Sequence, residues 1–205
     1  MSEWITQFLS IGAISLLGAV SPGPDFVLIS KQSLLGSRKA GLYTAFGIGS
    51  GLFLHLLLAL IGISVLLQKN PFIYLLFKYA CAAYLIFLGI QLLKPQKVPL
   101  SVTAPSLLPS RQIKSFSTGF FCNALNPKAS LFALSIFSQL IAPSTPLFLQ
   151  SIFALEMVLI TIGWFAILSL FLTHERFRQK YLKFQPRIMF IMGLFLLLLG
   201  IKAAM

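Results

Sequence analysis

Long apolar stretches separated by short polar connections dominate the pattern of this chain. Six stretches approach or exceed the ~20 residues that an α-helix needs to cross the hydrocarbon core of a bilayer. They cover residues 5–29, 42–67, 72–93, 116–141, 147–172 and 188–203. The pattern therefore predicts an all-α membrane protein with six transmembrane helices.

Two of these stretches contain proline motifs that a continuous helix can hardly accommodate. The first stretch contains Pro22-Gly23-Pro24, and the fourth contains Pro127 after Asn126. Proline removes a backbone donor and clashes with the preceding turn, while glycine adds conformational freedom. In lipid, the freed backbone groups are tolerated only where protein or a water-filled cavity satisfies them. We therefore predict that helices 1 and 4 are broken at these motifs; the alternative is a kink that only aids packing.

The two proline motifs occupy equivalent places in the two halves of the chain. Each lies early in a group of three stretches, and an odd number of spans gives the second group the opposite orientation in the membrane. We predict one integral membrane domain, 1–205, with inverted three-helix repeats at 1–94 and 116–205 and a cytoplasmic linker at 95–115. Transporters of this kind bind their substrate between the repeats, near the membrane midplane.

Composition and charge agree with a membrane location. The chain is 58% hydrophobic and only 10% charged, and its mean hydropathy is +0.92. Its net charge of +12 suggests nucleic acid as a partner, but twelve of the 16 basic residues lie in the connections between stretches one and two, three and four, and five and six. The positive-inside rule places these connections in the cytoplasm and both termini outside. A basic membrane face therefore explains the charge without nucleic acid.

Two of the four acidic residues lie inside apolar stretches. Asp25 follows the first break, and Glu156 lies in the middle of the fifth stretch. A carboxylate inside a membrane is costly unless it is protonated, paired or in contact with water, and such groups are usually functional. Both residues are candidates for proton coupling or substrate binding. The alternatives are a helix-capping acid or a partner of Lys31 for Asp25, and a protonated structural hydrogen bond for Glu156.

Three further polar residues, Asn126, Lys128 and His55, are candidates for substrate binding or proton coupling at the same site. Lys128 follows Asn126 and Pro127 and either faces a cavity, where it would neutralise a carboxylate, or extends to the interface. His55 either relays protons or bonds one helix to another. Asn123 is too weakly informative to be assigned. Cys81 and Cys122 lie on different stretches without a CxxC pair, so we predict no metal site and no cofactor.

Several motifs along the chain, taken in order, resemble those of the LysE/RhtB family of bacterial amino-acid exporters. They are Ser21-Pro22-Gly23-Pro24-Asp25, Gly36-Ser37-Arg38-Lys39-Ala40-Gly41, Gly47-Ile48 with Ser50-Gly51 and His55, Lys78-Tyr79 with Tyr84-Leu85 and Leu88-Gly89, and Gly119-Phe120 with Leu125-Asn126-Pro127-Lys128-Ala129. The chain departs from the family pattern at Ser37, where a basic residue is common. It departs again at Phe137-Ser138-Gln139, where a proline often precedes the glutamine.

The resemblance implies a transporter rather than an enzyme. Such a protein would export amino acids or close derivatives across the bacterial inner membrane, with the proton gradient as the driving force, and would associate as an oligomer. A rival from another class is a membrane thiol-disulfide protein of similar repeat architecture. That chemistry needs two cysteines brought together, and Cys81 and Cys122 lie at different points of the repeats.

Overall fold

The computed structural model of the protein describes residues 2–21, 23–33, 37–69, 71–94, 112–141, 145–172 and 175–204. Pro22 and most of the predicted linker, residues 95–111, lie outside the described residues. The described ranges contain eight α-helices. They are α1 Ser2–Val20, α2 Pro24–Lys31, α3 Arg38–Lys69, α4 Pro71–Leu93, α5 Gln112–Ala124, α6 Pro127–Leu140, α7 Leu147–Leu172 and α8 Glu175–Ala204.

The helices occur in the order that the apolar pattern predicts. A pair interrupted by a proline motif is followed by two longer helices, and the same order then repeats. The main difference is α8, which begins at Glu175 rather than near 188 and contains Pro186 inside the helix. Its first half is rich in lysine, arginine and glutamine, which are good helix formers. Hydropathy marks only the apolar half, so it places the start of this helix too late.

Part of the membrane prediction can be checked on the described residues. By length and composition, Arg38–Ile61 and Leu147–Leu172 can cross a membrane, with mean hydropathies of 2.0 and 2.2. Trp4–Val20 and Pro24–Lys31, bent by 63° at the break, would together form a third span. Two further apolar helices are shorter, Tyr79–Leu93 and Met189–Lys202. The all-helical class is confirmed, whereas the count of six spans stays a prediction.

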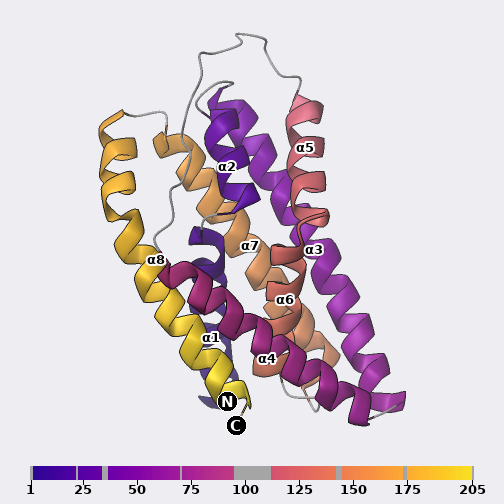
Figure 1. The fold of residues 1–205 in the computed structure, drawn as a ribbon. Helices are drawn as coiled ribbons and strands as arrows, with labels where there is room; N and C mark the ends of the chain where they lie inside the picture. The colour runs from indigo at the N-terminus through magenta and orange to yellow at the C-terminus, as the bar shows by residue number, and fades with distance from the viewer. Residues whose placement is uncertain are drawn as a thin grey trace.

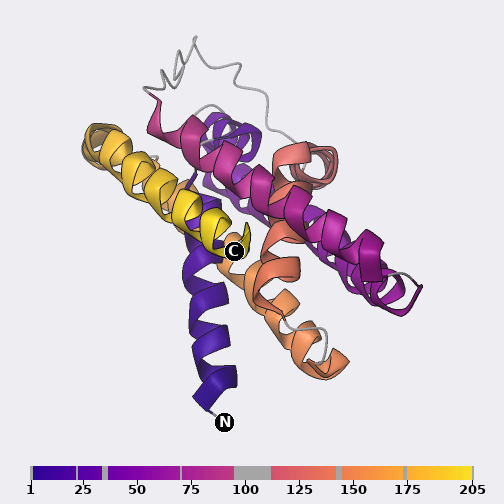
Figure 2. The ribbon, with the colours of Figure 1, turned by 60° about the horizontal axis from the view of Figure 1, so that its bottom comes forward.

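Glycines allow two helix pairs to approach closely. A Cβ on Gly47 of α3 would clash with the carbonyl oxygen of Phe116 in α5, and one on Gly119 of α5 would clash with that of Thr44 in α3. Similarly, α4 and α8 meet at Gly89 and Gly193. Figures 1 and 2 show these two pairs side by side. Close packing of this kind is a main source of helix association in membranes, and it fixes α5 against α3.

Both ends of the chain lie at the same end of the bundle, and the last turn of α2 and the first turns of α3 and α5 lie toward the other (Figure 1). At that second end α2 finishes with Lys31, α3 begins with Arg38 and Lys39, and α5 carries Lys114 in its first turn. Ser37 caps α3 there, because its hydroxyl accepts a hydrogen bond from the backbone N–H of Ala40 at 3.0 Å. The described basic residues at these helix ends therefore lie at the same end of the bundle.

Candidate functional site

The structure breaks both helices where the proline motifs predict. The first break lies between Val20, the end of α1, and Pro24, the start of α2, and its Gly23 has an extended backbone with φ −175°. The second break separates Ala124, the end of α5, from Pro127, the start of α6. Proline begins the new helix in both cases, as expected for a residue that has no N–H to leave unsatisfied.

The helix that follows the second break, α6, is capped by Asn126, a residue of the break itself. The Asn126 side-chain oxygen accepts a hydrogen bond from the backbone N–H of Lys128 at 3.0 Å, which satisfies a donor at the start of α6. The carbonyl oxygen of Asn123, in the last turn of α5, accepts from the Asn126 N–H at 2.9 Å. It also lies 3.0 Å from Nε2 of His55 in α3, and a carbonyl only accepts, so the ring donates. His55 therefore links α3 to the end of α5.

Lys128 extends from the second break into the first. Its Nζ donates to the Ser21 hydroxyl at 2.6 Å and to the Ser21 carbonyl oxygen at 3.4 Å. A Cβ on Gly23 would lie 3.2 Å from the same Nζ. The ammonium thus satisfies a carbonyl beside the first break, and it faces the interior of the bundle instead of extending to the membrane interface.

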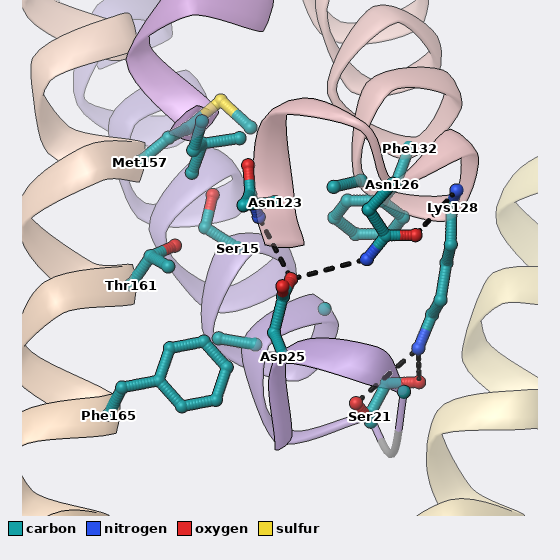
Figure 3. Close-up of a pocket in the computed structure, with 15 residues that line it drawn as sticks. Ser15, Ser21, Asp25, Asn123, Asn126, Lys128, Phe132, Met157, Thr161 and Phe165 are labelled. Carbon is teal, nitrogen blue, oxygen red and sulfur yellow. Dashed lines mark hydrogen bonds between the residues drawn. The ribbon is translucent and has the colours of Figure 1, made fainter. Parts of the chain in front are cut away.

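Asp25 lies across the same gap and is held from the second break (Figure 3). One carboxylate oxygen, Oδ2, accepts from the side-chain amides of Asn123 at 2.9 Å and Asn126 at 3.3 Å. The Cys122 thiol also lies beside this carboxyl group. The other oxygen, Oδ1, is buried and makes no hydrogen bond within the described part of the chain. Lys31, one of the alternative partners, is exposed at the far end of α2.

A pocket lies between the two breaks. Its polar lining includes the charged pair Asp25 and Lys128, the amides of Asn123 and Asn126, and the hydroxyl side chains Ser15, Ser21 and Thr161. Its apolar lining includes Leu52, Phe132, Met157 and Phe165. The cavity volume open to the centres of water molecules is about 60 Å³. On the same measure, one water needs roughly 10–15 Å³. The pocket can therefore hold several waters or a small polar solute.

Glu156 lies away from this pocket, although its neighbour Met157 lines it. A Cβ on Gly12 of α1 would lie 2.5 Å from Oε1 of Glu156, so the carboxyl group is packed between α1 and α7. Its Oε2 is buried and forms no hydrogen bond with any described residue. The structure thus brings Asp25, Asn126 and Lys128 together, adds His55 through Asn123, and leaves Glu156 apart.

Asn123 is one of several site residues that the sequence alone did not assign, together with Ser21 and Thr161. Its side chain bonds Asp25, its carbonyl bonds His55, and it is 3% exposed. The available signal was its place three residues before Asn126, which puts two amides beside one predicted break. Because the break itself interrupts the helix, helical spacing could not show that both amides point at the same carboxylate.

The two cysteines do not form a pair. Both are free. Cys81 of α4 lies by α6, where the Ser135 hydroxyl donates to its carbonyl oxygen at 3.2 Å. Cys122 lies by Asp25. The thiol-disulfide alternative therefore has no support in the geometry.

Apolar helices, close glycine contacts and a charged pocket at two helix breaks define the class: a helical membrane protein with a polar site inside its bundle. Residues 16–205 match the model of the LysE type translocator family. This protein belongs to that family, which confirms the resemblance seen in its motifs.

Individual relatives agree with the family match. A threonine efflux protein of Escherichia coli (strain K12) is 28% identical over 177 residues, which is 85% of each chain. The uncharacterized membrane protein YrhP of Bacillus subtilis is 30% identical over 200 residues, 94% of this chain and 95% of the relative. A homoserine/homoserine lactone efflux protein of Salmonella typhimurium is 29% identical over 145 residues, 70% and 68% of the two chains. No solved structure matches this chain.

Proposed function

We propose that this protein is a secondary transporter, and not an enzyme, that exports small amino acids or close derivatives across the bacterial inner membrane by proton antiport. The observation that carries the proposal is the pocket between the two breaks, which is lined by one carboxylate and one ammonium, Asp25 and Lys128. An α-amino acid carries the complementary pair of charges, so electrostatics favour its binding there. The family match and the efflux function of two relatives support the direction of transport.

The two charged residues have separate roles in this proposal. Asp25 receives the substrate ammonium, and Lys128, held against Ser21, receives the substrate carboxylate. Buried Oδ1 of Asp25 lacks a hydrogen bond in the described part of the chain, and an ionised oxygen in that state is costly. A bound ammonium or a bound proton would each remove that cost. Substrate and proton therefore compete for one atom.

This competition is the physical basis of coupled exchange. Ionised Asp25 takes up the substrate ammonium from the cytoplasm. On the outer side, a proton binds Oδ1 and removes the charge that held the ammonium, so the substrate leaves. The carrier then returns and releases the proton inside. Asn123 and Asn126 hold Oδ2 throughout, and they link the carboxyl group to the start of α6.

Asp25, rather than Glu156, is the proton carrier in this proposal. Asp25 lines the pocket, whereas the described lining lacks Glu156. The Glu156 carboxyl group packs against Gly12 between α1 and α7. Such a position suits a protonated structural group that has no direct contact with substrate.

Helix contacts support two inverted repeats in a single membrane domain. The repeats would relate α1 to α5, α2 to α6, α3 to α7 and α4 to α8. Under this relation, a contact between α3 and α5 predicts a contact between α7 and α1. In the same way, the contact of α3 with α6 predicts one of α7 with α2, and the contact of α2 with α5 predicts one of α6 with α1. All of these pairs are in contact. Three spans in each repeat would give opposite orientations, and the basic helix ends would face the cytoplasm.

The test is amino-acid counterflow and proton-driven efflux in proteoliposomes that contain the purified protein. Asp25→Asn keeps the shape of the side chain but removes its charge and its proton-binding site. We expect Asp25→Asn to lose both activities, while Glu156→Gln retains proton-driven efflux. Size-exclusion chromatography in detergent checks that both variants fold. Full proton-driven efflux by folded Asp25→Asn would reject the assignment.

The same assay separates the proposal from its rivals. A thiol-disulfide mechanism requires the cysteines, so a double Cys81→Ser, Cys122→Ser variant would lose activity. We expect that variant to keep its efflux. A subunit that only assembles with other proteins would give no flux in liposomes that contain this protein alone. Homo-oligomer formation stays a prediction of the family resemblance.

A further inference from the structure

One wall of the pocket is formed by a single face of α7. Met157, Thr161 and Phe165 follow one another at intervals of four residues, so they lie on the same side of the helix, and all three line the pocket. In Figure 3 they lie on the opposite side of Asp25 from Lys128. A substrate whose ammonium meets Asp25 and whose carboxylate turns toward Lys128 would therefore direct its side chain toward this wall.

The Thr161 hydroxyl differs from most hydroxyls in the described helices. Helical serine and threonine commonly donate to the carbonyl one turn back. Ser15 does so to Ile11 at 2.6 Å, Thr44 to Ala40 at 2.9 Å and Thr118 to Lys114 at 2.7 Å. Thr161 is only 7% exposed, yet no hydrogen bond joins it to another described residue. Its hydroxyl thus lies at the pocket wall with its hydrogen-bonding capacity unused.

The rest of the wall limits what this hydroxyl can recognise. Met157 and Phe165 are apolar, so Thr161 supplies the polar group between them. The described lining carries one acid and one base, Asp25 and Lys128, and both are engaged by the substrate's α-groups in the proposed function. A charged substrate side chain would therefore lack a charged partner at this wall.

We infer that Thr161 determines substrate specificity by forming a hydrogen bond with a hydroxyl on the side chain of a short, neutral amino acid. This inference rests on the proposed function of the pocket. A site that hydrogen-bonds a substrate hydroxyl rejects the analogue that lacks it, because the buried polar group of the protein is then left unpaired. Thr161 touches the variable part of the substrate and leaves proton coupling to Asp25.

The experiment compares two substrates of nearly identical shape. L-Threonine and L-valine differ by a hydroxyl in place of a methyl group, and counterflow in proteoliposomes gives kcat/KM for each. We expect the wild-type protein to prefer threonine. Thr161→Val should lower the threonine-to-valine ratio by about tenfold, the effect of one hydrogen bond, mainly through slower threonine transport. Thr161→Ser, which keeps the hydroxyl, should retain most of the preference.

Thr118→Val is the matched control, because the Thr118 hydroxyl bonds its own helix at Lys114 and lies outside the pocket lining. We expect this variant to keep the wild-type ratio. If Thr161→Val transports too slowly for kinetics, stabilisation of the detergent-solubilised protein by each amino acid gives the same comparison. Greater stabilisation by threonine should disappear in Thr161→Val.

The outcomes separate this inference from the proposed function. An unchanged ratio in Thr161→Val, or an equal fall in Thr118→Val, overturns the role of Thr161 while Asp25-dependent efflux still stands. If the wild-type protein gives neither counterflow nor stabilisation with any amino acid, the proposed function fails and the inference fails with it. A ratio lost in Thr161→Val and kept in Thr161→Ser supports both.

Discussion

The two helix breaks face each other, but they are satisfied in different ways. The second break is capped locally, because the Asn126 side chain accepts from the first turn of α6. The first break has no such cap: Gly23 precedes α2 and offers no side chain. Its Ser21 carbonyl is instead satisfied by Lys128, which belongs to the second break. One break is thus completed by local contacts, and the other depends on its neighbour.

The charged groups follow the same asymmetry. Asp25 lies on the first break, but both amides that hold its Oδ2 come from the second break region. In each of these hydrogen bonds between the breaks, the donor therefore belongs to the second break and the acceptor belongs to the first. In the proposed function, the second break supplies the hydrogen-bond donors, and the first break supplies the acceptor, Asp25, for which substrate and protons compete.

The largest expected effect follows from removing the donor that crosses between the breaks. Lys128→Met keeps most of the side chain's length but loses its charge. We expect counterflow to fall below detection, because the substrate carboxylate loses its partner and the Ser21 carbonyl loses a donor. One unsatisfied buried group costs about 1–3 kcal/mol, so thermal unfolding in detergent should begin at a lower temperature.

Lys128→Arg is the control for this change, since it keeps the positive charge but has a different shape and donor geometry. Partial activity in Lys128→Arg and none in Lys128→Met would assign the effect to charge. Wild-type counterflow in Lys128→Met would show that the pocket does not use the ammonium, and the comparison of donor and acceptor breaks would lose its main support.

A smaller effect is expected from variants that separate the two roles of Asn126, which caps α6 and donates a hydrogen bond to Asp25. Asn126→Ala loses both, and a lost helix cap costs about 1 kcal/mol. Asn126→Ser can still cap α6, but its shorter side chain has no amide to donate to Asp25. We expect thermal stability to fall in Asn126→Ala and to recover in Asn126→Ser.

Transport should respond differently in these two variants. If Asp25 needs the Asn126 amide, efflux should fall by about tenfold in both, as expected for one hydrogen bond to a charged group. Full recovery of efflux in Asn126→Ser would mean that the cap alone matters and that Asn123 suffices to hold the carboxylate.

The breaks themselves could be predicted from sequence because their cause is local. Proline and glycine act on the turn in which they stand, so Pro24 and Pro127 mark the starts of α2 and α6 without knowledge of the fold. Hydropathy likewise predicts α7 with its bounds, because apolar residues predominate from one end of that helix to the other. It misses the start of α8, where basic residues extend the helix beyond its apolar half.

Which residues line the site depends on how each helix is rotated about its own axis. The lining could therefore be predicted only in part. Glu156 and Met157 are adjacent in sequence, yet Met157 lines the pocket and Glu156 packs against α1. Hydropathy gives the depth of a residue in the membrane but not the direction it faces. The few polar residues of α7 form no stripe along one side, so its sequence did not mark the face that meets the pocket. The same limit hid Asn123, whose role depends on how α5 packs against α2 and α3.

The smallest expected effect comes from giving the first break a side chain. Gly23→Ala is compatible with the extended backbone at φ −175°, which any residue adopts. The new Cβ would lie 3.2 Å from Nζ of Lys128, which is the mobile end of a long side chain and can shift by a few tenths of an ångström. We expect folding to be unchanged and KM for counterflow to rise by only a few-fold, because the ammonium moves slightly while its bonds to Ser21 remain. A loss of activity as large as that of Lys128→Met would instead show that the first break tolerates no displacement of the ammonium, and that both breaks are equally rigid.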